Sequence, residues 1–349
     1  MTSRDAVPPN ADVEAAADAR LIFELLDGFR ASKAAFTAVS LGVFDRLHGR
    51  PATVAQLASE LQVAEHALER ILGACVAKGL LALEGGLYSN LPPADRFLRL
   101  QSPETLSGYV LYSDRVLYRL WGRLEDAVRE GTNRWEQEFG GREKLFDHFF
   151  ATDGEKRRFL AGMHGAGLLS SPATVAAFDL SRFQRMVDLG GGTGHLVTEA
   201  CRRYPKLRGV IFDLPSVQPL AEEYVRAAGL ADRIEVLAGD FFAAELPPAD
   251  LYAVGRILHD WAEPGIAQLL RKVHAGLPQG GALLICEKLL NEERDGPATA
   301  YLQSLNMLVC TEGRERTASE YEALVKQAGF RELKVQRTGA PVDAMLALK

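Results

Sequence analysis

The chain has 349 residues, a formal net charge of −6 and an apolar content of 47%. This length is enough for two domains with sizeable cores, and the net negative charge argues against a general nucleic-acid or anionic-membrane partner. The four cysteines are scattered, and the chain has neither an apolar signal region at its start nor an apolar run of about 18 residues, so we expect reduced thiols in a cytoplasmic protein without a membrane span.

The first predicted element is a long helix. Residues 1–12 are polar, contain a Pro-Pro pair and are predicted to be disordered. The segment Ala15–Leu47 then carries apolar residues at helical spacing. An apolar face this broad must be covered, either within its own domain or by a second subunit.

A compact pattern of two short helices and a hairpin follows. The helices are expected at Thr53–Leu61 and Glu65–Lys78, and the hairpin strands at Leu80–Leu83 and Leu87–Ser89 around Glu84-Gly85-Gly86. This order is typical of a winged-helix unit. Because the second helix is close to neutral, we expect a dimerisation module there and no nucleic-acid binding.

From about residue 180 onward, strands and helices alternate, which predicts a doubly wound, Rossmann-like α/β sheet. Strands are expected near 184–189, 209–213, 234–238, 249–255 and 281–287. Two further strands, Leu333–Arg337 and Ala344–Leu348, should form an antiparallel hairpin at the sheet edge. The expected domains are a dimerisation domain over 13–110, a helical connector lining the active site over 111–180, and a catalytic domain over 181–349.

The first of these strands runs into a glycine loop with Gly190, Gly192 and Gly194. A tight turn from strand to helix needs positive φ angles, which glycine accepts, and it lets a ligand approach the backbone. The dinucleotide pattern G-x-G-x-x-G fails, because its third glycine would fall on His195 or Val197. Asp188 would repel a pyrophosphate but suits an ammonium or sulfonium group, which indicates S-adenosylmethionine (SAM).

Acidic and aromatic residues at the next two strand ends strengthen this interpretation. Asp213 lies a little over 20 residues past the loop, where an acid can bind a ribose diol, although a helix-capping or turn role is the alternative. Asp240 and Phe241 follow the third strand and could hold an adenine amino group and cover its ring. We expect one of Phe241 and Phe242 to be a core residue instead.

The chemistry is expected after the fourth strand, in the run from Arg256 to Trp261. Ligands of open α/β sheets lie over the carboxyl ends of the strands, which places His259 at the reaction centre. Glu287 ends the fifth strand, and Glu315 follows a later apolar helix. An acid beside a histidine fixes its tautomer and stabilises its protonated form. The alternative for Glu315 is a pairing with Arg314 or Arg316, or a capping role.

At this point the chain resembles the SAM-dependent small-molecule O-methyltransferases, and most closely their acetylserotonin O-methyltransferase group. The resemblance covers nearly the whole chain, and its most specific part is Ser304-Leu305-Asn306-Met307-Leu308-Val309 followed by Thr311-Glu312-Gly313 and Glu315-Arg316-Thr317. It implies a homodimer in which the N-terminal helices interlock, a small aromatic acceptor, and S-adenosylhomocysteine as the product.

The resemblance also implies residue roles. His259 would be the general base, with Glu287 and Glu315 supporting it, and the acceptor would contact Tyr112, Asp260, Asn306 and Cys310. The pattern and the resemblance together give the expected cofactor residues: Asp188, Gly190, Gly192, Asp213, Leu214, Gly239, Asp240, Phe241 and Arg256.

The chain departs from the animal acetylserotonin enzymes at three positions. Cys310 stands where they have a glutamine, Phe150 stands near an expected tyrosine, and Gly167 falls near an expected tryptophan. We therefore expect a pocket that is less polar near Cys310 and roomier near Gly167. No cluster of His, Asp and Glu has the look of a metal site, so no metal is expected.

Three other functions remain open at this stage. A C- or N-methyltransferase could use the same fold, since a strongly nucleophilic carbon or amine needs no base. A winged-helix regulator could sense SAM without catalysis. A nicotinamide dehydrogenase is disfavoured by the glycine spacing.

Overall fold

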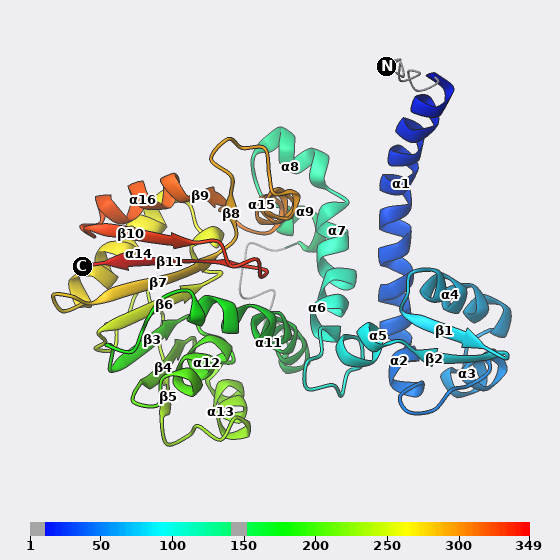
Figure 1. Ribbon diagram of the computed structural model, residues 1–349, viewed down its shortest axis with the longest axis horizontal. Coiled ribbons are helices and arrows are strands. Elements are labelled where there is room, and N and C mark those ends of the chain that lie inside the picture. The colour runs from blue at the N-terminus through cyan, green and yellow to red at the C-terminus, as the bar shows by residue number, and fades with distance from the viewer. Residues whose placement is uncertain (1–10, 141–151) are drawn as a thin grey trace, which may run out of the picture. The chain divides into compact units, whose positions relative to one another are not determined.

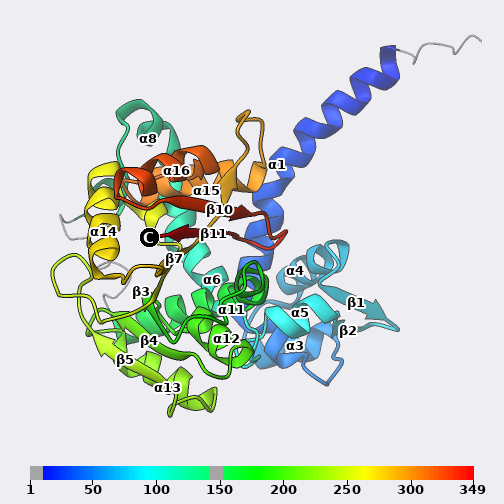
Figure 2. The same ribbon diagram turned by 60° about the vertical axis from the view of Figure 1, so that its left-hand side comes forward.

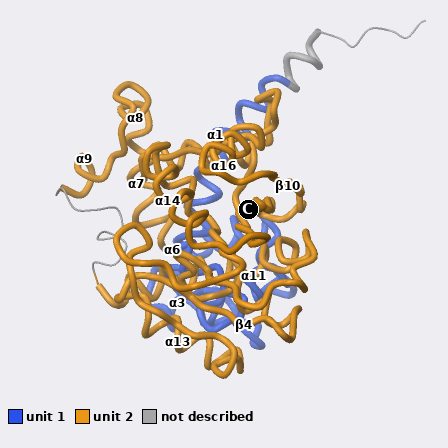
Figure 3. Tube along the Cα trace, turned by 90° about the vertical axis from the view of Figure 1, so that its left-hand side faces the viewer, with its two compact units in different colours: residues 1–111 blue, residues 112–349 orange. Residues whose placement is uncertain are grey.

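The computed structural model describes residues 11–140 and 152–349, with side chains from residue 18 onward. The chain divides into two compact units, residues 1–111 and 112–349 (Figure 3). Among the described residues, no helix is both long enough and apolar enough to cross a membrane.

The first unit is mostly helical (Figures 1 and 2). The expected long helix is broken at Gly42, whose φ of 78° ends α1 and begins α2. Of the segment 1–12, residues 1–10 lie outside the described residues, and α1 begins at Ala11. The elements are α1 (Ala11–Leu41), α2 (Val43–Arg46), α3 (Val54–Leu61), α4 (Glu65–Ala77), β1 (Leu81–Glu84), β2 (Leu87–Asn90), α5 (Pro92–Phe97) and α6 (Ser107–Tyr112), which reaches the boundary between the units.

The helix–helix–hairpin order of this unit agrees with the sequence prediction. Thr53 starts α3 with a reciprocal capping box, in which Gln56 also bonds back to the Thr53 backbone. The hairpin turn is one residue shorter than expected, because Glu84 still pairs with Leu87 and only Gly85 and Gly86 form the turn. Leu57, Leu68, Leu72 and Leu81 are among the residues that form the core of this unit.

The second unit contains a seven-stranded sheet in the order β10-β11-β7-β6-β3-β4-β5. Its strands are β3 (Arg185–Leu189), β4 (Arg208–Asp213), β5 (Ile234–Ala238), β6 (Leu251–Gly255), β7 (Ala282–Glu287), β10 (Glu332–Gln336) and β11 (Asp343–Leu348). The first five pair in parallel, and β11 pairs antiparallel with β7 and β10. The predicted doubly wound sheet with a C-terminal edge hairpin is confirmed.

The helices of this unit are η1 (Ser113–Leu117), α7 (Tyr118–Trp121), α8 (Leu124–Glu130), α9 (Trp135–Phe139), α11 (Asp153–Ala176), α12 (His195–Arg203), α13 (Gln218–Ala227), η2 (Leu258–Asp260), α14 (Glu263–Gly276), α15 (Ala298–Cys310) and α16 (Ala318–Gln327). Apolar residues of α14 and α16 pack on one face of the sheet, and those of α11, α12 and α13 pack on the other. The chain reverses its winding direction at β3, which has β4 on one side and β6 on the other. Ligands of doubly wound sheets bind at such a switch point.

A small second sheet, not anticipated from the sequence, joins two distant segments. The strand β8 (Leu289–Leu290) follows β7 and pairs in parallel with β9 (Arg316–Thr317). This pairing brings the segment that contains Glu315 next to the carboxyl end of β7.

Candidate functional site

The glycine loop lies at the switch point, between β3 and α12. Gly190, Gly192 and Gly194 have φ angles of 67°, 55° and 76°, as predicted for this turn. A Cβ atom at Gly190 would lie 2.6 Å from the Ile257 side chain, and one at Gly194 would overlap the Ile211 side chain. The loop therefore needs glycine for packing as well as for its backbone, and it offers bare backbone to a ligand.

Two carboxyl groups lie beneath and beside this loop. Asp188 is buried, and burial followed by repulsion from Asp213 raises its pKa to about 8. Burial also raises the pKa of Asp213 to about 6, although the Gly192 and Leu214 amides both donate to its carboxylate at 2.7 Å. Neither acid forms an ion pair with a described side chain. A cationic ligand would relieve this repulsion, so the pair fits a sulfonium or ammonium group.

Asp213 therefore also has the structural role that was its alternative interpretation, because its carboxylate binds backbone amides of the glycine loop and of the next turn. A carboxylate has about four acceptor sites, so two backbone bonds leave capacity for a ribose diol. Gly239 has a packing reason of its own, because a Cβ there would overlap the Phe212 ring.

The segment after β5 places two aromatic rings differently. Phe241 lies beside the glycine loop, since a Cβ at Gly190 would be 3.4 Å from its ring. Phe242 instead packs edge-on against Trp261, with ring centroids 4.8 Å apart. Asp240 is exposed and accepts from the Phe242 amide at 2.8 Å.

Lys272 of α14 holds this segment and was missed by the sequence analysis. Its ammonium donates to the carbonyl oxygens of Phe241 at 2.8 Å, Phe242 at 3.1 Å and Ala244. These bonds fix the backbone from which the Phe241 ring projects.

Arg256 follows β6 with a φ of 57°, in the left-handed region that non-glycine residues seldom adopt. Its amide donates to the Cys286 carbonyl on β7 at 3.0 Å. Such a conformation costs about 1–3 kcal/mol and is found preferentially at ligand-binding positions.

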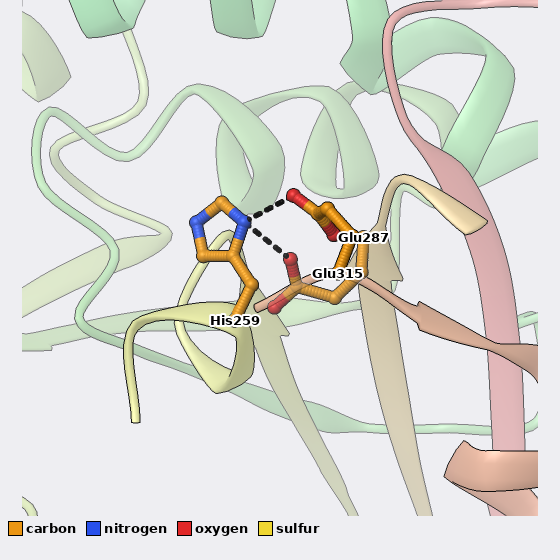
Figure 4. Close-up of side chains that lie close together, drawn as sticks. All are labelled: His259, Glu287 and Glu315. Atoms are coloured by element: carbon orange, nitrogen blue, oxygen red, sulfur yellow. Dashed lines mark hydrogen bonds and ion pairs between the residues drawn. The ribbon is translucent and has the colours of Figure 1, made fainter. Parts of the chain in front are cut away.

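His259, Glu287 and Glu315 converge in one buried cluster (Figure 4). The Nδ1 atom of His259 lies 2.7 Å from Glu315 Oε1, a hydrogen bond, and 3.5 Å from Glu287 Oε2. Its other ring nitrogen, Nε2, is 3.6 Å from Asp260 Oδ1. Glu315 therefore pairs with the histidine through its side chain, and the expected alternative pairing with Arg314 or Arg316 is not what its carboxylate makes.

The local backbone explains how these groups meet. Glu287 ends β7, and its Oε1 accepts from the Ile257 and Leu258 amides at 3.0 and 2.8 Å, which anchors the turn η2 that carries His259. Gly313 packs directly against the His259 carbonyl, and a Cβ there would overlap it. The neighbouring β8–β9 pair then directs Glu315 to the imidazole.

A buried arginine holds the same turn from the other side. Arg316 is fully buried, and its guanidinium donates to the carbonyl oxygens of Leu258 at 3.4 Å and Trp261 at 3.2 Å and to Glu263 at 3.1 Å. Glu315 therefore fixes the His259 ring, and the next residue, Arg316, fixes the backbone that carries His259. From the sequence, Arg316 was named in the family motif and as a possible partner of Glu315, and this backbone-anchoring role was not predicted.

The charges of the cluster change its proton affinities. Burial alone would lower the pKa of His259, but the negative charges of Glu287, Glu315 and Asp260 outweigh burial and raise this pKa to about 10. Burial raises the pKa of Glu287 to about 7 and that of Asp260 to about 6, against the opposing charge of His259. The three carboxyl groups therefore make the His259 imidazole a strong proton acceptor.

The predicted acceptor residues Asn306 and Cys310 lie one turn apart on α15. Trp121 Nε1 donates to Asn306 Oδ1 at 2.9 Å, so the Asn306 amide group points its own N–H donors elsewhere. Burial and the charge of Asp260 raise the pKa of the Cys310 thiol well above its usual range, which keeps it neutral. Trp135 Nε1 donates to the Cys310 carbonyl at 2.7 Å.

The remaining predicted positions have different outcomes. Tyr112 packs edge-on against Phe159 of α11, with ring centroids 5.2 Å apart. Phe150 lies outside the described residues. The prediction of extra room at Gly167 is wrong, because the His195 imidazole occupies the space that a side chain at this position would take.

The three residues of the His259 cluster are relevant to the expectation that the protein binds no metal. One ligand atom from each of His259, Glu287 and Glu315 lies within 4.8 Å of the others, a spacing that could hold a metal ion. From the sequence these three residues were expected to form a base with two supporting acids, and no metal was expected. Here the imidazole Nδ1 is already engaged by the Glu315 carboxylate at hydrogen-bond distance.

Comparisons with known proteins agree with this architecture. Residues 121–331 match the model of an O-methyltransferase domain, and residues 23–99 match that of an O-methyltransferase dimerisation domain. The chain is 42% identical to acetylserotonin O-methyltransferase from Gallus gallus, over 95% of this chain and 97% of the relative.

Two solved structures extend the comparison. The crystal structure of human N-acetylserotonin methyltransferase in complex with SAM matches with a TM-score of 0.91 and 38% identity, over 99% of both chains. An N,N-dimethyltransferase acting on an aminoriboflavin, from Streptomyces davawensis, matches with a TM-score of 0.80 and 25% identity, over 95% of this chain and 99% of that one.

Proposed function

The chain belongs to the SAM-dependent O-methyltransferases, and we propose that it methylates the hydroxyl of a small aromatic acceptor with His259 as the general base. The observation that carries the proposal is the buried bond between His259 Nδ1 and Glu315 at the carboxyl end of the sheet. Because Nδ1 donates to this carboxylate, neutral His259 presents its Nε2 lone pair to an acceptor.

The proton affinities suit a phenolic acceptor. A phenolic hydroxyl has a pKa of about 10, taking tyrosine as the model, and the pKa of His259 is also raised to about 10. Proton transfer between them is therefore close to balanced, and Glu315 stabilises the imidazolium that forms. When bound, SAM would supply an electrophilic methyl group; the acceptor oxygen would form a bond to this methyl as its bond to sulfur breaks, and S-adenosylhomocysteine would leave.

For the cofactor we propose the residues around the switch point. Asp213 would accept from the ribose hydroxyls, and Phe241, held by Lys272, would cover the adenine ring. Asp240 would accept from the adenine amino group, and Arg256, with its strained backbone, would contact the cofactor directly. The bare glycine loop supports a ligand that lies against the backbone.

For the acceptor we propose the groups that surround the free side of the imidazole. Asp260 Oδ1 lies 3.6 Å from His259 Nε2, and the negative charge of Asp260 helps to raise the pKa of the Cys310 thiol on α15. The N–H donors of Asn306, turned away from Trp121, would bind an acceptor oxygen. A neutral thiol at Cys310 supports a less polar acceptor than acetylserotonin itself.

We also propose a homodimer built on α1. Leu21, Ile22, Phe23, Leu25, Leu26 and Phe29 are all exposed on this helix, with Leu25 at 69%. A contiguous apolar surface of this kind marks a protein interface, and the chain carries the family's dimerisation domain. The four buried free thiols support a cytoplasmic location, where thiols stay reduced.

The test is His259→Ala, assayed with labelled SAM and a panel of phenolic and hydroxyindole acceptors. We expect kcat to fall by about 10²- to 10⁴-fold, the usual contribution of a general base, with little change in SAM affinity. Partial recovery is expected at high pH, where the acceptor ionises without help. His66→Ala, at an exposed position on α4, is the matched control. A His259→Ala enzyme with wild-type kcat at neutral pH contradicts the proposal.

The second candidate is N-methylation, which the likeness to the Streptomyces davawensis dimethyltransferase favours. An aromatic amine carries its own lone pair and does not need His259 to remove a proton first. Turnover of amines that is unaffected by His259→Ala, together with inert phenols, would replace the first proposal. The non-catalytic SAM sensor is no longer supported, because the family consists of enzymes.

A further inference from the structure

A second histidine lies at the glycine loop, and the proposed mechanism does not use it. His195 is the first residue of α12, directly after Gly194. Its imidazole packs against the backbone of α11 at Gly167, where any Cβ would overlap the ring. Gly167 on α11 therefore leaves the space that the His195 ring occupies.

The tautomer of this imidazole is fixed by its neighbours. His195 Nδ1 lies 2.8 Å from Ser171 Oγ, and this hydroxyl donates its single proton to the Gly167 carbonyl at 2.8 Å. The hydroxyl oxygen must then accept from the histidine, so Nδ1 carries the ring proton. The other nitrogen, Nε2, is left with a lone pair and can only accept.

The imidazole is also kept neutral. Burial, followed by the charges of His164 and Arg256, lowers the pKa of His195 to about 3. Nε2 has no hydrogen-bond partner among the described residues, and the side chain is partly exposed. Nε2 of His195 is therefore a neutral hydrogen-bond acceptor of fixed orientation at the edge of the glycine loop, and no described residue donates to it.

A neighbouring histidine braces the same loop. His164 Nδ1 lies 2.8 Å from the hydroxyl of Thr193, and its ring packs 4.3 Å from that of Tyr224. Burial lowers the pKa of His164 to about 4, so it is neutral as well. The loop is therefore braced by His164 independently of His195.

We propose that His195 is a cofactor-binding residue, whose Nε2 accepts a hydrogen bond from the ammonium group of the methionine part of SAM. An atom that can only accept attracts an N–H donor and repels a carboxylate. The unpaired acids Asp188 and Asp213 make the same region favourable for a cation. This inference rests on the proposed placement of the cofactor over the glycine loop.

The experiment is calorimetric binding of three ligands to wild type, His195→Ala and Ser171→Ala. The ligands are S-adenosylhomocysteine, its analogue without the amino group, and 5′-methylthioadenosine, which lacks the whole amino-acid part. We expect His195→Ala to weaken S-adenosylhomocysteine by about 10- to 100-fold, the range for a hydrogen bond to a charged group. Binding of the other two ligands should not change. Ser171→Ala should show the same selectivity among the three ligands with a smaller loss of affinity. This substitution removes the bond that fixes the His195 tautomer but leaves the imidazole ring in place.

His274→Ala, a histidine of α14 that packs on Phe330, is the control, and thermal unfolding checks that each variant is folded. An equal loss for all three ligands, or no loss for any, overturns the assignment of His195. Equal losses for S-adenosylhomocysteine and its deaminated analogue overturn the ammonium contact. A wild-type protein that binds none of them contradicts the cofactor site itself, a result distinct from a selective failure at His195.

Discussion

Replacing Glu315 by glutamine should move the pH dependence of catalysis, because this carboxylate is the closest charge to His259. Only the neutral imidazole accepts a proton, and the pKa of His259 is raised to about 10. For the wild type, kcat/KM should therefore increase with pH up to about pH 10. Removing a negative charge destabilises the imidazolium, which lowers the pKa of His259 and shifts this rise to lower pH.

The size of the shift follows from the geometry. The bonded atoms are 2.7 Å apart, which puts the centres of the two charges at roughly 4 Å. At an effective dielectric constant of about 20, such a pair interacts by about 4 kcal/mol, which corresponds to about 3 pKa units at 1.36 kcal/mol per unit. Since Glu287 and Asp260 remain, we expect the rise in Glu315→Gln to move down by about 2–3 pH units.

The variant should lose rate at high pH and gain rate near neutrality. A weaker base transfers the proton less readily, so the plateau should fall by roughly tenfold, while at pH 7 more of the imidazole is neutral. The assay is kcat/KM from pH 6 to pH 10.5 with one phenolic acceptor, whose own ionisation affects every variant equally.

Glu312→Gln is the control, because Glu312 is exposed and accepts from the Ala262 amide at 3.3 Å instead of contacting the histidine. A Glu315→Gln profile that coincides with this control, or that moves to higher pH, refutes the reasoning.

Four further outcomes are expected. Asp213→Ala should weaken SAM binding while the protein stays folded, and unchanged affinity by calorimetry would contradict the ribose role. Phe29→Asp on α1 should convert the dimer to monomer in light scattering, and a monomeric wild type at micromolar concentration would refute the dimer. EDTA should leave kcat unchanged because the Nδ1 of His259 is bonded to a carboxylate, whereas a loss restored by added metal would show a metal site. The pKa of Asp188 is raised to about 8, so its ionisation increasingly disfavours the folded state as the pH rises from its unfolded value, about 3.9, through 8. Asp188→Asn should therefore gain in Tm over wild type between pH 5 and pH 9, and a constant difference would argue against this ionisation.

The central strands of the sheet were predictable because they are buried on both faces. The runs around Val210 and Leu283 are continuously apolar, the run around Val187 is interrupted only by Asp188, and each is bounded by a turn or helix signal, so position and order follow from the sequence. The break at Gly42 was not predicted, because a glycine inside a helical pattern is tolerated and only the structure reveals its left-handed φ.

Two of the three residues in the His259 cluster could likewise be inferred from topology. His259 follows β6 and Glu287 ends β7, and these strands are neighbours in the sheet, so their proximity follows once the strands are placed. Glu315 follows no strand of that sheet. It reaches the histidine through the two-residue pair β8–β9, and elements this short leave no periodic signal in a sequence.

Gly167 shows why a single substitution was misleading. Loss of a large side chain suggests a cavity, but interiors are close-packed, and a vacated volume is usually taken by a neighbour. Here the neighbour is His195, which comes from another helix and could not be paired with Gly167 from spacing alone.

The protonation state of His259 shows the same dependence on geometry. A histidine with one acid is expected to be a neutral base near pH 7, but three carboxyl groups around one ring raise its pKa to about 10. The number of acids that converge on a ring depends on tertiary structure. It follows that acceptors more acidic than a simple phenol, which ionise without help, should depend less on His259. A graded series of acceptor pKa values would therefore separate general-base help from the positioning that the rest of the site provides.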